Sequence, residues 1–380
     1  MIEFLLHPLV VFAVIWIIAY LIFRFVFRRG LRGVKLYPLG FVLKTERTVV
    51  LFDKIASTAP SILKVLSDMG VALGFGMMAF SIYILSKNLG VYLFTPTQVG
   101  PQNIVIPLVI GVTIRLEHLP YILFALGIVL ITHEGMHGLI ARLEKIRIKS
   151  TGLFLFYLFP GGFVEPDEEE FRKASSRARA RVAAGGSLAN LVVGLLVVLL
   201  MFGIFSTAEA GVVVIEVDEG SGIKVNDVVY SVNGVPVNRN TLFENISATD
   251  LLTIQTSRGN FTYRLGEPIN VPLAWILGEI GIRRVDYYFP MKLDIGSPVA
   301  EYTLYRILSW TQLIAINVAI FNMMPIYFLD GSLLLSALLE PRIRCEKAMK
   351  LLNTSLTAIC LLLLAANIGF TFKTFGFLQI

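Results

Sequence analysis

Several apolar stretches of this 380-residue chain are long enough to cross a lipid bilayer. A helix needs about 20 mainly apolar residues to span the hydrocarbon core. Apolar residues make up 56% of the chain and charged residues only 16%, whereas about 25% charged residues is usual in soluble domains. The sequence therefore predicts an α-helical polytopic membrane protein. Its six expected membrane helices cover residues 5–27, 69–87, 119–143, 183–205, 302–325 and 351–372.

Two apolar stretches need a separate interpretation. Residues 5–27 have neither a basic leader nor a small-residue cleavage site, so we interpret them as a retained anchor and not as a signal peptide. Residues 104–114 contain Pro107 and Gly111 and are too short to cross the bilayer as a helix. They are expected to form either a re-entrant or an interfacial segment.

Lysine and arginine gather in four clusters that all fall on one side of the membrane if six spans alternate. Positive loops favour the cytoplasm. The pattern therefore predicts that both termini and residues 206–301 are extracytoplasmic. The net charge of +6 is explained by these loops, and no nucleic-acid partner is needed to account for it. The clusters lie at residues 24–35, 142–149, 172–181 and 342–350.

Residues 206–301 differ in character from the rest of the chain. Runs of β-branched residues alternate with turn signals there, such as Asn233-Gly234 after residues 228–232. A small β-rich domain is therefore predicted between the fourth and fifth spans. The remaining segments are residues 1–68 (first membrane helix and cytoplasmic segment), 69–205 (membrane core) and 302–380 (membrane core with the last helix). Within the first of these, residues 39–52 are predicted to form a hairpin.

The third predicted span contains His133-Glu134-Gly135-Met136-His137, an H-E-x-x-H pattern. Residues four apart share one face of a helix, so His133 and His137 can both reach one ion. Neutral imidazoles suit zinc, and Glu134 can take a proton from water activated by the metal. The alternative is a polar helix interface without metal, but ionisable groups within a span are costly and usually functional. The pattern therefore predicts a catalytic zinc site within the membrane.

The depth of this site follows from its distance to the basic residues. His133 precedes Arg142, the expected cytoplasmic boundary, by nine residues. At about 1.5 Å per residue, the metal would lie about 13 Å inside that boundary. Hydrolysis at this depth needs water, so the site is expected to line a polar cavity.

A catalytic zinc usually has three protein ligands, and the sequence offers one good candidate for the third. His7 and His118 lie near the outer ends of spans and are interpreted as interfacial side chains. Asp330 follows the fifth span at the cytoplasmic side, just after Pro325 breaks the helix. It is therefore either the third ligand or the N-cap of a helix over residues 332–340.

Four more polar positions near these motifs are considered as parts of the site. Asn322 and Asn190 could donate hydrogen bonds to a scissile carbonyl or bond between helices. Residues 166–170 are rich in acids and are interpreted as a helix start and not as a metal site. Glu165 adjoins a glycine-rich stretch and is assigned no role.

The pattern His133-Glu134-x-x-His137, together with Asn322-x-x-Pro325-x-x-x-Leu329-Asp330-Gly331, resembles the site-2 protease family of intramembrane zinc metalloproteases. The second motif of that family, N-x-x-P-x-x-x-L-D-G, is matched at every fixed position. In the family its aspartate is the third zinc ligand, and the resemblance carries this role onto Asp330.

Three more stretches are similar to features of this family. Gly161-Gly162-Phe163-Val164 resembles a membrane-dipping loop thought to pair with substrate as an added strand, so Gly162 and Phe163 are expected to contact the substrate. Residues 184–190 resemble its A-G-P-x-x-N element, with Gly186 in place of the usual proline. The predicted β-rich domain, from Gly211 to Asn233-Gly234, resembles the PDZ domain that many members insert at this place, and residues 206–301 are therefore expected to be a PDZ-like domain with its linker.

The resemblance implies an intramembrane zinc endopeptidase of the cell membrane that cuts membrane-spanning proteins near the cytoplasmic face. Its expected partners are transmembrane substrates and the lipid bilayer. The alternative is an inactive scaffold that binds protein tails through the PDZ-like domain. A third class, a metal or proton transporter, would be indicated by an inverted repeat with paired broken helices, and the sequence shows none. The oligomeric state, the substrate and the role of the PDZ-like domain, as a filter or as a binder of carboxyl termini, stay open.

Overall fold

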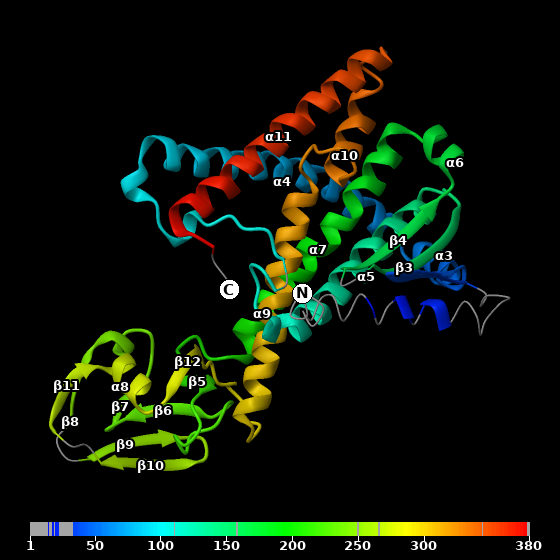
Figure 1. The fold of residues 1–380 in the computed structure, drawn as a ribbon. Coiled ribbons are helices and arrows are strands. Elements are labelled where there is room, and N and C mark those ends of the chain that lie inside the picture. The colour runs from blue at the N-terminus through cyan, green and yellow to red at the C-terminus, as the bar shows by residue number, and fades with distance from the viewer. Residues whose placement is uncertain are drawn as a thin grey trace. The chain divides into compact units, whose positions relative to one another are not determined.

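The computed structural model describes residues 14, 17–18, 20–22, 33–109, 111–156, 159–248, 251–264, 267–343 and 345–377. The chain divides into two compact units (Figure 1). One consists of residues 1–195 and 311–380, and the other of residues 196–310. Helices dominate the first unit and strands the second.

Five helices in the described part of the chain are long and apolar enough to cross a membrane. They are α4 (Pro60–Phe94), α5 (Leu119–Leu143), α7 (Ser176–Ile204), α9 (Pro298–Asn322) and α11 (Glu346–Phe375). Each covers most of one predicted span, which is consistent with the predicted polytopic helical class. The other span, residues 5–27, lies almost entirely outside the described residues, and the total of six stays a prediction.

Proline and glycine mark the ends of several of these helices. Pro60, Pro120 and Pro298 lie in the first turns of α4, α5 and α9, where a missing N–H costs nothing. Gly376 follows α11 with φ +73°, a backbone angle that glycine adopts readily because it has no Cβ. The helix bounds are therefore set locally by residues that the sequence displays.

Small residues on α7 let other helices approach it closely. Ala180, Ala183 and Ala184 are buried against Met77 and Met78 of α4. The same cluster includes Met323, which follows α9, and Leu334 of α10 (Asp330–Leu339). Small side chains at helix crossings are typical of membrane bundles, where close packing replaces the hydrophobic driving force. In the first unit, α7 is therefore packed on several sides.

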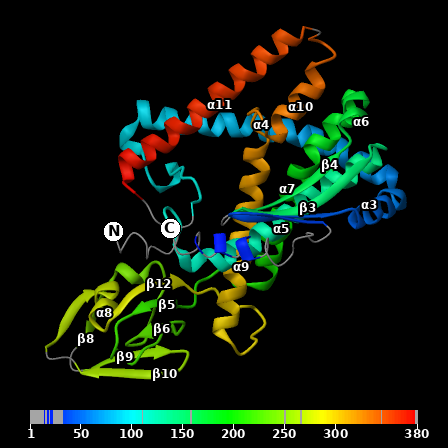
Figure 2. The same ribbon diagram turned by 45° about the vertical axis from the view of Figure 1, so that its right-hand side comes forward.

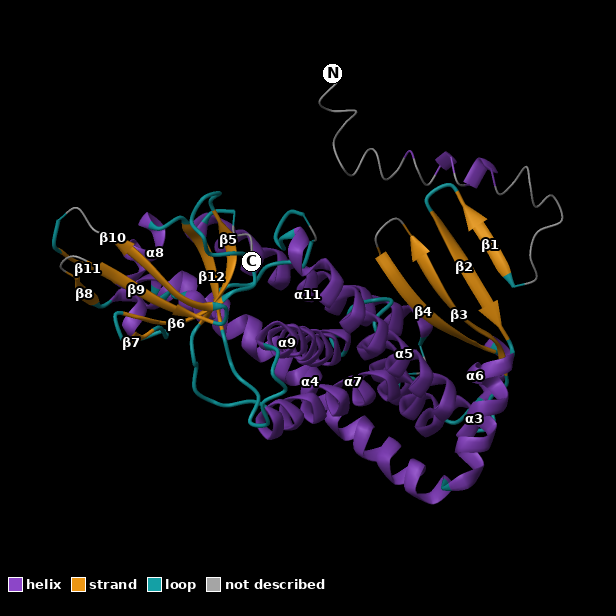
Figure 3. Ribbon diagram, turned by 90° about the horizontal axis from the view of Figure 1, so that it is seen from below, coloured by secondary structure: helices purple, strands orange, loops and turns teal. Residues whose placement is uncertain are grey.

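A four-stranded antiparallel sheet accompanies the helices of the first unit (Figure 3). Its strands are β1 (Val34–Tyr37), β2 (Gly40–Thr45), β3 (Ile148–Phe156) and β4 (Phe159–Pro166), in the order β1-β2-β3-β4. In this order β4 is an edge strand. The short helix α6 (Glu168–Lys173) follows it.

The predicted hairpin over residues 39–52 is wrong in its bounds. The hairpin consists of β1 and β2, and helix α3 (Arg47–Thr58) begins after Thr45 and Glu46. Phe52 and Ala56, four residues apart, pack on Leu139 and Leu143 of α5. This helical spacing of apolar side chains outweighs the β-branched residues that suggested a strand.

The segment at residues 104–114 is not helical in its described part. It follows Asn103, whose side chain bonds Asn88 of α4 at 2.7 Å, and Val105 N donates to Thr371 of α11 at 3.0 Å. Asn88 also donates to Asn367 of α11 at 2.8 Å. These buried polar contacts tie the segment to α4 and α11, which run beside each other (Figure 1 and Figure 2).

The second unit is the predicted β-rich domain. A sheet in the order β10-β9-β6-β5-β12, with β7 paired to β6, and a two-stranded sheet of β8 and β11 pack with helix α8 around one apolar core. The predicted strand at 228–232 appears with its predicted bounds, and Asn233-Gly234 is the turn after it. The elements are β5 (Val212–Val217), β6 (Val228–Val232), β7 (Val235–Pro236), β8 (Asn245–Ala248), β9 (Leu251–Thr256), β10 (Gly259–Arg264), β11 (Ile269–Pro272), α8 (Leu273–Glu279) and β12 (Ile282–Tyr287).

The chain enters and leaves this β-rich domain at neighbouring points. Ser206 N donates to Pro290 O at 2.8 Å, and Phe205 and Met291 form an antiparallel bridge. The domain is therefore an insert whose two ends meet. Its PDZ-like identity stays a prediction.

Candidate active site

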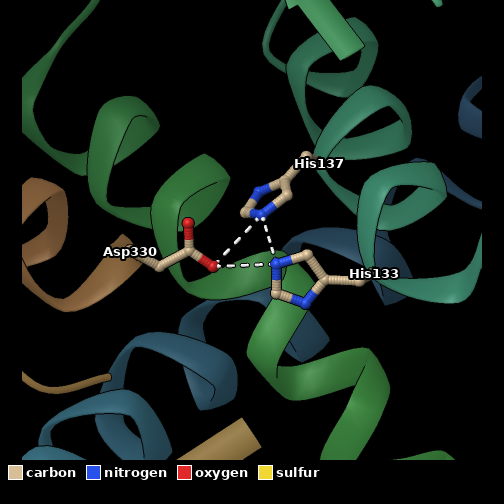
Figure 4. Close-up of side chains that lie close together, drawn as sticks. All are labelled: His133, His137 and Asp330. Carbon is tan, nitrogen blue, oxygen red and sulfur yellow. Dashed lines mark hydrogen bonds and ion pairs between the residues drawn. The ribbon is translucent and has the colours of Figure 1, made fainter. Parts of the chain in front are cut away.

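Three side chains converge on one point in the first unit (Figure 4). His133 Nε2 and His137 Nε2 each lie 3.2 Å from Asp330 Oδ2, and the two nitrogens are 3.3 Å apart. His133 and Asp330 are buried. The histidines are one turn apart on α5, as the H-E-x-x-H spacing predicts. Among the described residues this is the group of histidines and acids close enough to hold a metal ion.

Asp330 reaches the histidines because of the turn between α9 and α10. Helix α9 ends at Asn322 and α10 begins at Asp330 itself. Within the turn Phe328 has φ +76°, a conformation that bulky residues adopt rarely. A Cβ at Gly331 would lie 2.1 Å from Met323 O, so glycine permits the two ends of the turn to approach. The N-cap alternative for Asp330 is wrong, because Leu329 occupies that position and α10 starts two residues earlier than expected.

Helix α7 passes directly behind the two histidines. His137 Nδ1 lies 2.7 Å from the Val182 carbonyl oxygen, and His133 Nδ1 lies 2.9 Å from Asn190 Nδ2. A Cβ at Gly186 would come within 2.4 Å of His137 Nε2 and 2.6 Å of His133 Cε1. The imidazoles, as they are placed here, therefore leave no room for a side chain at position 186, where the sequence departs from the related motif.

Glu134 lies beside the three converging side chains and is not one of them. Its Oε2 accepts a hydrogen bond from Val164 N of β4 at 3.1 Å. Gly162 of the same strand faces it, since a Cβ there would lie 3.0 Å from Glu134 Cγ. The carboxylate is therefore held between α5 and the edge strand β4.

A cavity of about 620 Å³ lies at the three converging residues and Glu134. Its polar lining consists of the three converging residues with Glu134, Asn190 and Asn322, and the rest of its wall is mainly apolar. A cavity is therefore present as expected, but it is polar only around the converging side chains and apolar elsewhere. Apolar side chains that line it include Val129, Leu130, Val164, Phe171, Phe321 and Phe328.

The structure brings Asn322 into the cluster but leaves Phe163 outside it. Asn322 Nδ2 lies 2.8 Å from Asp330 Oδ2 and 3.1 Å from His133 Nε2. Phe163 lies on the face of the sheet opposite to Gly162, as alternate residues of a strand do. Its ring covers Gly152, with Lys44 Nζ 5.3 Å from its centroid.

Glu165 is also absent from the cluster. Its Oε2 accepts hydrogen bonds from Ser150 Oγ at 2.6 Å and from Lys44 Nζ at 3.1 Å. These two partners lower the pKa of the Glu165 carboxyl below its usual value. The acid-rich stretch that follows is a helix start, as predicted. Asp167 caps α6 by accepting from the N–H groups of Glu169 and Glu170, and its bond to Arg147 lowers its pKa to about 2.

A charge network around the buried Arg181 joins helices next to the site. Arg181 of α7, 7% exposed, donates to Asp68 of α4 at 2.7 Å and to Glu144 at 2.6 Å. Arg181 directly precedes Val182, whose carbonyl faces His137. Neither contact was predicted, because the sequence alone does not show which acidic residues will lie beside the arginines of a basic cluster. His118, the other described histidine, lies near Glu117 at 3.7 Å and outside the cluster.

Comparison with known proteins agrees with the geometry. Residues 121–363 match peptidase family M50, and this stretch includes all three converging residues and Glu134. The match points to the membrane metalloproteases as the class of protein. More specifically, the chain belongs to peptidase family M50, the family of the site-2 proteases, so the predicted relationship is confirmed. The members of this family are zinc metalloproteases.

One curated relative is an uncharacterized protein of Methanocaldococcus jannaschii. It is 28% identical over 218 residues, which is 55% of this chain and 54% of the relative. The chain therefore spans about half the length of the curated relative that it matches.

Proposed function

We propose that this protein is an intramembrane zinc endopeptidase that hydrolyses peptide bonds of membrane-spanning substrates. The observation that carries the proposal is the position of Glu134. It shares a cavity with His133, His137 and Asp330, yet it is held by β4 and stays apart from the three converging atoms. Three ligands with a nearby free carboxylate are what metal-assisted hydrolysis requires.

The donor set fits zinc. Two imidazole nitrogens and one carboxylate oxygen, all of them atoms that bind zinc, lie within 4.8 Å of one another and line one cavity. When bound, zinc supplies polarisation of the scissile carbonyl and acidification of water. His133, His137 and Asp330 would hold it.

Side chains of the protein carry out the proton transfer and stabilise the developing charge. Glu134 takes a proton from the attacking water on a carboxylate oxygen and delivers it to the nitrogen of the leaving amine. The Val164 N–H bond keeps this carboxylate in place. The amide of Asn322, at the rim of the cluster, can donate to the oxygen of the scissile carbonyl as charge develops there.

The edge strand β4 offers a way to hold an unwound substrate. Its hydrogen bonds to β3 use one edge, and the Val164 N–H on the other edge faces Glu134. An extended peptide paired with this free edge, near Gly162, would run past the carboxylate. Pairing would also replace the helical hydrogen bonds that the substrate loses when it unwinds. Phe163 lies on the other face of the same strand, and its contact with substrate stays a prediction.

The chemistry is tested by cleavage of a single-span substrate with purified protein in lipid vesicles. We expect products cut within the span, full inhibition by a zinc chelator and recovery on adding zinc. Mass spectrometry of the products locates the cut. A folded protein that binds one zinc per chain and leaves a panel of single-span substrates intact would favour the inactive scaffold, which binds tails through the insert.

We further propose that the site lies toward the cytoplasmic face and that the insert is extracytoplasmic. The basic clusters at residues 142–149 and 172–181 support this orientation. The test is labelling of single cysteines in intact cells with a membrane-impermeant reagent, in a background where exposed Cys345 is replaced by serine. We expect Glu219→Cys in the insert to be labelled and Arg172→Cys in α6 to be protected. The opposite pattern would invert the topology.

A further inference from the structure

The two histidines of the site are held in different ways. A neutral imidazole that binds a metal through one nitrogen carries its proton on the other, and the partner of that other nitrogen fixes the tautomer. For His137 the partner is the backbone carbonyl of Val182, at 2.7 Å from Nδ1. A carbonyl only accepts, so Nδ1 of His137 carries the proton and Nε2 is free to bind.

His133 has a side chain as its partner. The Asn190 amide, fully buried, lies 2.9 Å from His133 Nδ1 through its Nδ2. Because an NH2 group only donates, this orientation requires the proton of His133 to be on Nε2, the atom that faces Asp330 at 3.2 Å. Such a tautomer has no lone pair for a metal. The oxygen and nitrogen of the amide are interchangeable in shape, so the opposite orientation fits the same space.

Thr132 distinguishes between the two amide orientations. Its Oγ1 lies 2.9 Å from the Ile128 carbonyl and 3.3 Å from Asn190 Oδ1. A hydroxyl has one proton, and the bond to the Ile128 carbonyl uses it. The lone pairs that remain can accept from an amide NH2. Turning the amide so that Nδ2 faces Thr132 and Oδ1 faces His133 therefore satisfies all three groups together.

We propose that Asn190 is a positioning residue that selects the metal-binding tautomer of His133, with Oδ1 accepting from Nδ1–H and Thr132 holding the amide in that orientation. This inference rests on the proposed zinc site but on no particular substrate. It differs from a role of Asn190 as a donor to the substrate. Here the amide accepts a hydrogen bond through its oxygen, whereas a donor to the substrate would use the NH2 group.

The test compares zinc affinities of variants at one position. Asn190→Asp keeps an acceptor toward His133, whereas Asn190→Leu has a similar size and no polar atom. Zinc dissociation constants are measured by competition with a chelator of known affinity, without any substrate. We expect Asn190→Leu to weaken zinc binding about 10–100-fold, the usual effect of losing such an outer partner. Asn190→Asp should stay within a few-fold of the wild type.

Two further variants complete the design. Ser187→Ala is a matched control on the same helix, because the buried Ser187 hydroxyl has no hydrogen-bond partner among the described residues. It should bind zinc like the wild type. Thr132→Val should weaken zinc binding by a smaller factor, and it tests the proposal independently if Asn190→Leu does not fold.

Each outcome decides a different point. Wild-type affinity in Asn190→Leu, or in Thr132→Val if the leucine variant is unfolded, would overturn the proposal. If Asn190→Asp loses zinc as completely as Asn190→Leu, the acceptor role is wrong. A wild type that does not bind zinc overturns both this inference and the proposed enzyme, whereas zinc binding without cleavage overturns the enzyme alone.

Discussion

Glu134→Gln is expected to lower the rate of substrate cleavage by about 10²–10⁴-fold, the range that general acid–base catalysis contributes. Glutamine keeps the size of the side chain and an oxygen that can accept from Val164 N, but it cannot take up the proton of water. Because Glu134 is not one of the three converging residues, zinc content should stay at one per chain. Single-turnover cleavage and metal analysis of the same preparation measure both effects.

Glu165→Gln is the matched control for this change. Glu165 is a carboxylate on β4 that bonds Ser150 and Lys44 and lies outside the cavity lining. Its replacement should leave cleavage close to the wild-type rate. Near-normal turnover of Glu134→Gln would remove Glu134 from the mechanism.

Asp330→Ala should abolish zinc binding and cleavage together. The change removes one of three converging ligand atoms and leaves Asn322 Nδ2 without its 2.8 Å partner. We expect a larger loss of zinc affinity than the 10–100-fold typical of losing an outer partner. The measurement is the zinc dissociation constant, with cleavage assayed at saturating zinc.

His118→Ala serves as the control, because it removes a histidine that is not in the cluster. It should retain both zinc and activity. Full metal occupancy and activity in Asp330→Ala would mean that another residue is the third ligand. Glu165 would be a poor substitute, because its carboxylate is engaged by Ser150 and Lys44.

The parts of this protein that could be predicted from the sequence are those determined by residues close together in the chain. Apolar length identified five helices long enough to cross a membrane in the described residues, and turn chemistry at Asn233-Gly234 identified a hairpin of the insert. The pairing of His133 with His137 followed from helical spacing alone. Asp330 is nearly two hundred residues away, so its place beside them rested on the resemblance and on the depth argument.

The contacts that could not be predicted depend on how helices pack. Val182 and Asn190 face the histidines only because α7 crosses α5 at one particular register, and no local pattern encodes that register. Residues 39–52 were misjudged for a related reason. Short apolar runs fit a strand and a helix equally well until a partner surface exists, which here is the face of α5.

The meeting of the two ends of the insert has a consequence for the evolution of this chain. Residues 206 and 290 are hydrogen-bonded neighbours, so the strands and turns between them impose no spacing on the helices that precede and follow. Any module whose own termini lie close together could be exchanged at this junction, a property that favours domain insertion. Recombination at this position would therefore replace the insert while leaving the helices that carry His133, His137 and Asp330 unchanged.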